Sequence, residues 1–128
     1  GDDTIANSLG DDTLTGGAGA DLFTFEFVFL VRRIPVELSG DDRIADFRHG
    51  EDHLAFLYNY DPLAAAEIFD ALDSNDDQKV DAADAFADQL GGALVIDMDA
   101  LSAAVGNPIP EATVTFVGLT QLVLSDFA

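Results

Sequence analysis

Groups that could bind a metal ion recur along residues 73–84, which read DSNDDQKVDAAD. The side chains that could offer oxygen atoms to one ion are those of Asp73, Asn75, Asp77, Asp81 and Asp84. Carboxylate, amide and carbonyl oxygens are the ligands that Ca²⁺ prefers, and a loop can gather them around the ion. The stretch therefore predicts a calcium loop. The alternative is the solvated start of a helix with Asp77 or Asp81 as its N-cap, a role that needs only one or two of these residues.

The same residues resemble the calcium loop of EF-hand proteins, and in particular the dockerin kind, in which aspartate also stands last. In that frame Asp73, Asn75 and Asp77 take the first, third and fifth places. The resemblance implies that the backbone carbonyl of Lys79 takes the seventh place, Asp81 the ninth, through water, and Asp84 the twelfth. Gln78 stands at the sixth place, where a sharp turn favours glycine with a positive φ. Asp84 is one methylene shorter than the glutamate that usually ends such a loop. The resemblance therefore implies a calcium ion here, provided that Gln78 makes the turn.

Two helices are expected on either side of this loop. Asp61 would be the N-cap and Pro62 the first residue of a helix that runs to Leu72. Residues 81–90 contain strong helix formers and are followed by two glycines, which predicts a second helix. Residues 61–92 are therefore expected to form an inserted helix–loop–helix.

A different acidic pattern repeats every nine residues at the start of the chain. Each unit has a glycine, then an aspartate and then an apolar residue at intervals of two: Gly1/Asp3/Ile5, Gly10/Asp12/Leu14 and Gly19/Asp21/Phe23. Glycine lets the backbone turn tightly, so that carbonyl oxygens can face an ion, and the apolar residue can face inward from a short strand. The alternative is a series of turns rich in glycine and aspartate that binds no metal.

Residues 16–24, GGAGADLFT, fit the nonapeptide G-G-x-G-x-D-x-U-x of calcium-binding RTX (repeats-in-toxin) proteins, which this part of the chain resembles. The resemblance implies a parallel β-roll in which two nonapeptides make one coil. Asp3 and Asp21 would then stack on one side of the roll, and Asp12 would face the other way. The calcium ligands expected between the first and third loops are Asp3, Asp21 and the backbone carbonyls near Gly1, Gly16 and Ala18.

Most of the chain outside residues 61–92 resembles the C-terminal RTX domain of serralysin-type proteases and other type I secreted bacterial proteins. The segments that carry this resemblance are GGAGADLFTF, GDDRIADFRHGEDHLAF and VTFVGLTQLVLSDFA. It implies that Asp42 helps to complete a calcium site at the C-terminal end of the roll. It also implies that the acidic and apolar tail Ser125–Ala128 is presented to the exporter. An ordinary frayed terminus is the alternative for these last four residues.

Apolar runs predict strands over residues 23–31, 93–98 and 114–128. The expected fold class is mostly β: a short parallel β-roll of nonapeptides that continues into a β-sandwich-like sheet, with the helix–loop–helix inserted. One compact domain is expected, with three parts. These are the roll and the strands after it (1–60), the insertion (61–92), and the closing strands and tail (93–128).

The composition limits the functions that are open to this chain. Its 128 residues carry a net charge of −20, with a pI near 4.1 and a mean hydropathy of +0.18. With only five basic residues, binding to nucleic acid or to anionic membranes is not expected. No apolar run is long enough for membrane insertion, and the absence of cysteine excludes disulfides. A compact state with this charge repels itself unless cations neutralise it, which again favours calcium.

The sequence offers no catalytic constellation. His49 and His53 are four residues apart, but they do not form the zinc-protease motif H-E-x-x-H, because Glu51 is misplaced and Gly50 disfavours a helix; they are expected on the surface. Asp97 and Asp99 could resemble a glycosidase pair, but a strand edge or turn is the expected setting for them. We therefore expect a non-catalytic, calcium-binding module at the end of a longer protein, with any catalytic domain upstream.

The family resemblance implies how such a module works. It stays unfolded in the calcium-poor cytosol, passes through the type I secretion machinery and folds outside the bacterium on several calcium ions. The expected location is secreted or at the cell surface, and the expected partners are calcium, the exporter and the upstream domain. The alternative is an adhesion module, or one that binds carbohydrate or surfaces, in which calcium is structural. Its candidate aromatic residues are Phe27, Phe29, Tyr58 and Tyr60.

Overall fold

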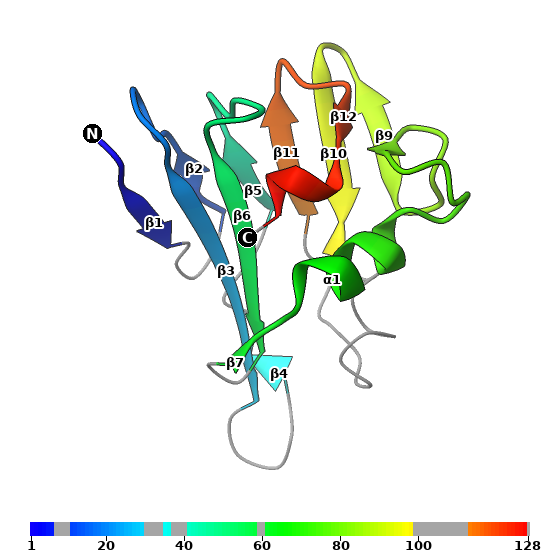
Figure 1. Cartoon of the computed structure of the whole chain (residues 1–128), viewed down its shortest axis with the longest axis horizontal. Coiled ribbons are helices and arrows are strands. Elements are labelled where there is room, and N and C mark those ends of the chain that lie inside the picture. The colour runs from blue at the N-terminus through cyan, green and yellow to red at the C-terminus, as the bar shows by residue number, and fades with distance from the viewer. Residues whose placement is uncertain (7–10, 30–34, 37–40, 59–60, 99–112, 128) are drawn as a thin grey trace.

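The computed structural model of the protein describes residues 1–6, 11–29, 35–36, 41–58, 61–98 and 113–127 (Figure 1). Strands dominate these ranges, and they contain a single α-helix, so the predicted mostly-β class is confirmed. No helix in these ranges is long and apolar enough to cross a membrane.

Three parallel strands form the centre of the first sheet: β1 (Thr4–Ala6), β3 (Leu22–Phe29) and β6 (His53–Tyr58). Two short antiparallel strands extend it, with β7 (Asp61–Pro62) beside β6 and β4 (Pro35–Val36) beside β3. Figure 1 shows β1, β3 and β6 side by side. The register places each residue of β1 opposite the residue two nonapeptides later in β3, as in Thr4 opposite Leu22.

The second sheet has the strand order β2-β5-β11-β10-β9. Its parallel part consists of β2 (Thr13–Leu14), β5 (Asp41–Ile44) and β11 (Thr113–Val117). An antiparallel hairpin of β9 (Ala87–Leu90) and β10 (Ala93–Asp97) completes the sheet. From β1 to β6 the main strands therefore alternate between the two sheets, because β2 and β5 belong to the second sheet and β1, β3 and β6 to the first.

The buried apolar side chains form one continuous cluster. Side chains alternate across a strand, and β5, β10 and β11 accordingly bury every second residue. The rings of Phe25 and Phe56 stack with their centroids 5.5 Å apart. Full burial of such a side chain stabilises the folded state by roughly 1.5–3 kcal/mol. Each of the three expected segments contributes to the cluster, through Phe23, Phe69 and Phe116 respectively.

The first expected helix forms, but it begins later than predicted. Helix α1 spans Ala65–Leu72 and has Ala64 at its N-cap. Asp61 and Pro62 were predicted to start the helix, and that prediction is wrong because they form strand β7. Pairing with β6 explains this, since the Leu63 N–H continues the pairing by donating to the Phe56 carbonyl at 2.8 Å. Pro62 lacks an N–H, which an edge strand tolerates.

The prediction of a second helix over residues 81–90 is wrong. The chain instead forms the short strand β8 (Val80–Asp81), a series of turns, and then the strand β9. Gly91 takes a φ of +55°, which closes a tight hairpin and lets β9 pair with β10. The hydrogen bonds to β10, which is itself paired with β11, override the helix propensity of the alanines. The segment is therefore a helix, a loop and a strand rather than a helix–loop–helix.

The C-terminal segment ends in regular structure. After β11, Gly118 turns the chain with a φ of +80°, and its N–H donates to the Gly92 carbonyl at 2.7 Å. Strand β12 (Gln121–Leu122) then pairs antiparallel with β8. A 3-10 turn, η3 (Leu124–Asp126), follows it. The strand predicted over residues 93–98 is thus confirmed as β10, whereas residues 30–31 lie outside the described part of the chain. The strand predicted over residues 114–128 is confirmed only in part, because the turn at Gly118 separates β11 from β12 and residues 124–126 form a 3-10 turn.

Candidate metal centres

Aspartates stack immediately before the parallel strands of the first sheet. The Asp3 N–H donates to Oδ1 of Asp21 at 2.9 Å, and the Asp21 N–H donates to Oδ1 of Asp52 at 3.0 Å. Asp21 and Asp52 are buried. The structure thus brings Asp3 and Asp21 together on one side and adds Asp52 as a third member. Asp52 was absent from the predicted ligands, although its Gly50/Asp52/Leu54 unit repeats the spacing of the nonapeptides.

The second sheet carries a matching pair. The Asp12 N–H donates to Oδ1 of the buried Asp42 at 3.0 Å, and the Asp12 carbonyl accepts from the Arg43 N–H at 2.8 Å. Asp12 therefore lies on a different sheet from Asp3 and Asp21. Asp42 therefore contacts Asp12, and these two residues form one candidate site. Gly10 and Gly40, which precede these two aspartates in the sequence, lie outside the described residues.

The carboxylate of Asp21 has an unusual environment. Its Oδ2 is buried and has no hydrogen-bond partner among the described residues. A Cβ atom at Gly16 would collide with this oxygen, so only glycine lets the backbone approach the carboxylate so closely. An ionised carboxylate that is buried with one unpaired oxygen costs free energy unless a cation lies near it. Asp21 Oδ2 is therefore the oxygen atom of this turn that is open to a cation among the described residues.

The other predicted ligands of this site lie close by. Gly19 has a φ of +124°, and a Cβ atom there would lie 2.6 Å from the Gly1 carbonyl oxygen. The N-terminal amine of Gly1 donates to the Ala18 carbonyl at 2.9 Å. The Ala18 carbonyl, one of the predicted ligands, thus already accepts a hydrogen bond. Gly1, Gly16 and Ala18 nevertheless belong to the same turn region as Asp21.

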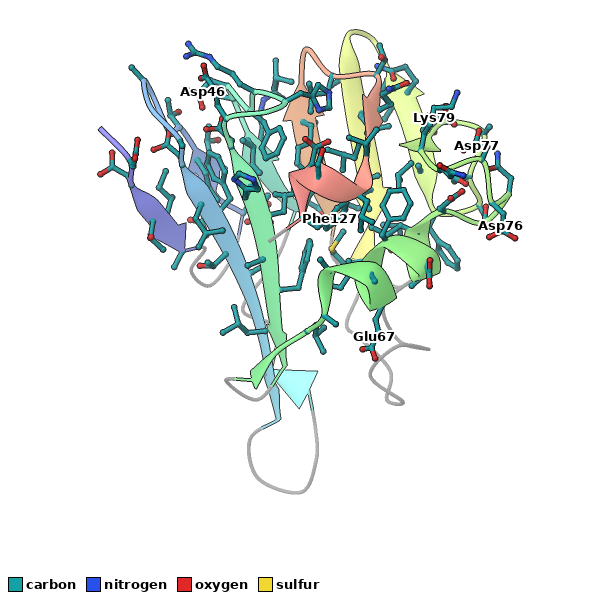
Figure 2. The ribbon with its side chains drawn as sticks, in the orientation of Figure 1. Asp46, Glu67, Asp76, Asp77, Lys79 and Phe127 are labelled. Carbon is teal, nitrogen blue, oxygen red and sulfur yellow. The ribbon has the colours of Figure 1, made fainter. Side chains whose placement is uncertain are left out.

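Asp46 fixes this turn and was missed in the sequence. Its two carboxylate oxygens accept the N–H groups of Gly16 and Gly17, each at 2.8 Å. Figure 2 shows Asp46 at the end of the sheets that also carries the N-terminus. Nothing in the nonapeptide spacing marks Asp46, because it lies 30 residues from Gly16 and outside any repeat unit.

The loop at residues 73–84 closes through its first and last members. Oδ2 of Asp73 accepts the Gln78 N–H at 2.9 Å, while Oδ1 and Oδ2 of Asp84 accept the N–H groups of Ser74 at 2.8 Å and Asp81 at 2.9 Å. Asp73 and Asp84 are only 6% and 4% exposed. Gln78 has a φ of +70°, so the chain makes the sharp turn at the sixth place without glycine.

The middle of the loop is open to solvent. Oδ1 of Asn75 accepts the Asp77 N–H, and Oδ1 of Asp77 accepts the Lys79 N–H, both at 3.1 Å. The Lys79 ammonium lies 3.8 Å from Asp77 and 3.7 Å from Asp81. Figure 2 shows Asp76, Asp77 and Lys79 on the outer side of the loop, away from the sheets. The alternative of a capped second helix is wrong, because residues 82–86 form turns and residues 87–90 form strand β9.

Calcium binding at these loops remains a prediction. In the part of the chain that the structure describes, no three His, Asp or Glu side chains gather in a geometry that would hold a metal. The carboxylates instead accept backbone N–H groups from neighbouring turns.

The structure describes some, but not all, of the other residues that the sequence singled out, namely the two histidines, the Asp97/Asp99 pair and four aromatic residues. Nδ1 of His49 lies 2.8 Å from Oδ2 of Asp126, a contact that the sequence did not reveal. His53 begins β6, and Asp97 ends β10, whereas Asp99 lies outside the described residues. The candidate binding aromatics cannot be placed on a surface: Tyr60, and the side chains of Phe27, Phe29 and Tyr58, also lie outside the described part.

Comparison with known proteins finds no match: neither a protein-family model, nor a curated protein, nor a solved structure is similar to this chain. The likeness to RTX domains therefore rests on the nonapeptides and on the segments that share their spacing.

Proposed function

We propose that this chain is a non-catalytic calcium-binding module that folds when it meets extracellular calcium. In this proposal it is the C-terminal folding and secretion module of a larger protein exported by a type I secretion system. The observation that carries the proposal is the buried Asp21, with its unpaired Oδ2, stacked between Asp3 and Asp52 at the start of three parallel strands.

The arrangement of strands supports a short β-roll. Strands β1, β2, β3, β5 and β6 alternate between the two sheets. The register of β1 on β3 pairs residues that are two nonapeptides apart, as a coil of two nonapeptides requires. The antiparallel hairpin of β9 and β10 would continue the second sheet beyond the roll in the manner of a sandwich. Each coil would bring aspartate-bearing turns of alternate repeats together, as with Asp3 and Asp21, which is what a shared ion between them needs.

Repulsion between negative charges makes the stability of the folded state depend strongly on bound calcium. Six of the aspartates that the structure describes are buried, and the chain carries a net charge of −20, so its negative charges repel one another in the compact state. A site with a Kd on the order of 10⁻⁴ M contributes about 1.4 kcal/mol in ~1 mM calcium. Three such sites would contribute roughly 4 kcal/mol, which is comparable with the net stability of a small domain. The module would therefore fold where calcium is millimolar and remain unfolded where it is scarce.

Calcium titration tests this function. We expect the β-type circular dichroism signal of the isolated chain to appear as calcium rises to millimolar levels and to disappear in chelator. Magnesium at equal ionic strength serves as the control, because Mg²⁺ demands a tighter octahedral geometry and releases its water reluctantly. A native signal that persists in chelator would rule out a calcium-driven folding switch.

A further inference from the structure

A hollow of about 560 Å³ lies where helix α1, the loop after it and the start of η3 meet, and we call it the α1 hollow. Pockets that bind small ligands and side chains have volumes of roughly 300–1,000 Å³. The apolar wall of the hollow is formed by Phe69 of α1 and by Val123 and Leu124. Leu124 is 48% exposed, so a ligand in the hollow would cover apolar surface that solvent now reaches.

Three aspartates line the same hollow: Asp70 in α1, and Asp73 and Asp76 after it. Asp70 and Asp76 are exposed, and Figure 2 shows Asp76 on the loop beyond the end of α1. Asp73 is the C-cap of α1, and the last turn of the helix contains no basic residue. The negative end of the helix dipole therefore adds to the charge of the carboxylates. This side of the hollow favours a positively charged group.

Lys79 is the only basic residue of the loop, and it does not neutralise the α1 hollow. Its ammonium lies 3.8 Å from a carboxylate oxygen of Asp77 and 3.7 Å from one of Asp81, and neither aspartate is among the described residues that line the hollow. A hard metal ion binds through oxygen and would leave the apolar wall uncovered. A ligand with both a positive charge and an apolar part is complementary to the whole hollow.

We propose that the α1 hollow binds a basic, partly apolar peptide segment of a partner protein. An arginine or lysine side chain of that segment meets Asp70 and Asp76, while its apolar stem and an adjacent apolar side chain pack on Leu124. Asp73 plays a smaller part, because its carboxylate already accepts the N–H groups of the loop at Asp77 and Gln78. The proposal does not rest on calcium-driven folding, since it needs only the folded chain.

The probe is a fluorescein-labelled peptide of alternating leucine and arginine, titrated against the folded chain at physiological salt. We expect saturable one-to-one binding by fluorescence anisotropy. A second peptide with citrulline in place of arginine keeps the shape and loses the charge, and it should bind at least about fivefold more weakly. A third peptide with serine in place of leucine keeps the charge and should also bind more weakly, because it cannot cover the apolar wall.

The double variant Asp70→Asn with Asp76→Asn tests the acidic side of the hollow. Asparagine tolerates the φ of +58° at position 76, so the backbone should keep its course. We expect the leucine–arginine peptide to bind roughly fivefold more weakly. The matched control is Glu67→Gln with Asp88→Asn, which removes the same net charge from exposed residues outside the hollow. It should change the affinity by less than about twofold.

Leu124→Ser tests the apolar wall. We expect a loss of roughly threefold in affinity for the leucine–arginine peptide, because less apolar surface is then buried on binding. The matched control is Leu90→Ser in β9, where the leucine is 60% exposed and lies outside the hollow. It should leave the affinity unchanged. Each of these substitutions is at an exposed position, so the native circular dichroism signal should persist in all of them.

Equal losses in the Asp70/Asp76 variant and in its Glu67/Asp88 control would overturn the proposal, because the peptide would then respond only to the net charge of the chain. Equal binding of the citrulline peptide would overturn it as well. So would equal binding of the serine–arginine peptide, which would leave no role for the apolar wall. These outcomes are distinct from those of the calcium titration, because peptide is added only to chain that already shows its native circular dichroism signal.

Discussion

Two residues define the candidate sites most sharply, and the first is Gln78. A residue other than glycine in the left-handed region costs roughly 1–2 kcal/mol, and Gln78 sits there with a φ of +70°. Gln78→Gly removes that strain but makes the unfolded chain more flexible, which costs about 0.4–1 kcal/mol. We therefore expect a net gain of about 0.5–1 kcal/mol in urea unfolding at saturating calcium. Gln78→Ala keeps the strain and should show no gain, and a less stable glycine variant would contradict this account.

The second residue is Asp21, whose substitution separates a metal ligand from a simple turn cap. Asp21→Asn keeps one oxygen that can accept the Asp3 N–H, but it removes the charge. Loss of one calcium site should lower the stability in ~1 mM calcium by about 1.4 kcal/mol and raise the calcium midpoint of folding. Calorimetry should count one ion fewer. Asp88→Asn, at an exposed position, is the control and should change neither value. An unchanged midpoint for Asp21→Asn would show that Asp21 is only a cap.

At the scale of elements, the loop after α1 keeps its shape without the second helix that was expected to frame it. Its ends are held by Asp73 and Asp84, which between them accept N–H groups from Gln78, Ser74 and Asp81. The helix in front presents Ile68, Phe69 and Leu72 to the core, and strand β9 follows the loop, while β8 lies within the loop itself and pairs with β12. The loop therefore has a rigid element on either side, although only one of them is a helix.

The combined variant Asp73→Ala with Asp84→Ala tests whether this element binds an ion. We expect one bound calcium to be lost in isothermal titration calorimetry, with the ions of the nonapeptide turns retained. The control is Asp70→Ala with Asp88→Ala, which removes the same charge from exposed positions nearby. An unchanged stoichiometry in the Asp73/Asp84 variant would mean that the loop is held by hydrogen bonds alone.

At the scale of the whole molecule, charge repulsion should be separable from specific binding. The Debye length falls from about 10 Å at 0.1 M salt to about 3 Å at 1 M, so salt screens the repulsion of a −20 chain without filling any site. In chelator with 1 M sodium chloride we expect partial recovery of the native circular dichroism signal, clearly below the signal in calcium. Sucrose, which carries no charge, should recover less at equal osmolality. Full recovery by salt would leave no role for bound calcium, and no recovery would leave no role for repulsion.

The sequence was sufficient for features that are written into short, regular spacings. The mostly-β class and the stacking of Asp3 with Asp21 follow from a nine-residue period, because that period brings equivalent turns into register on adjacent strands. The turn at Gln78 was recognised as the critical point of the loop, although its positive φ could not be known in advance.

Only the tertiary structure decided the features that depend on pairing within a sheet or on residues far apart in the sequence. Residues 87–90 are good helix formers by composition but become β9, because hydrogen bonds to β10 outweigh a propensity of tenths of a kcal/mol per residue. Asp61 and Pro62 join β6 for the same reason. The His49–Asp126 contact spans 77 residues, and no local pattern encodes a pair at that separation. Folding brings those two residues together, and with them the end of the chain enters the core.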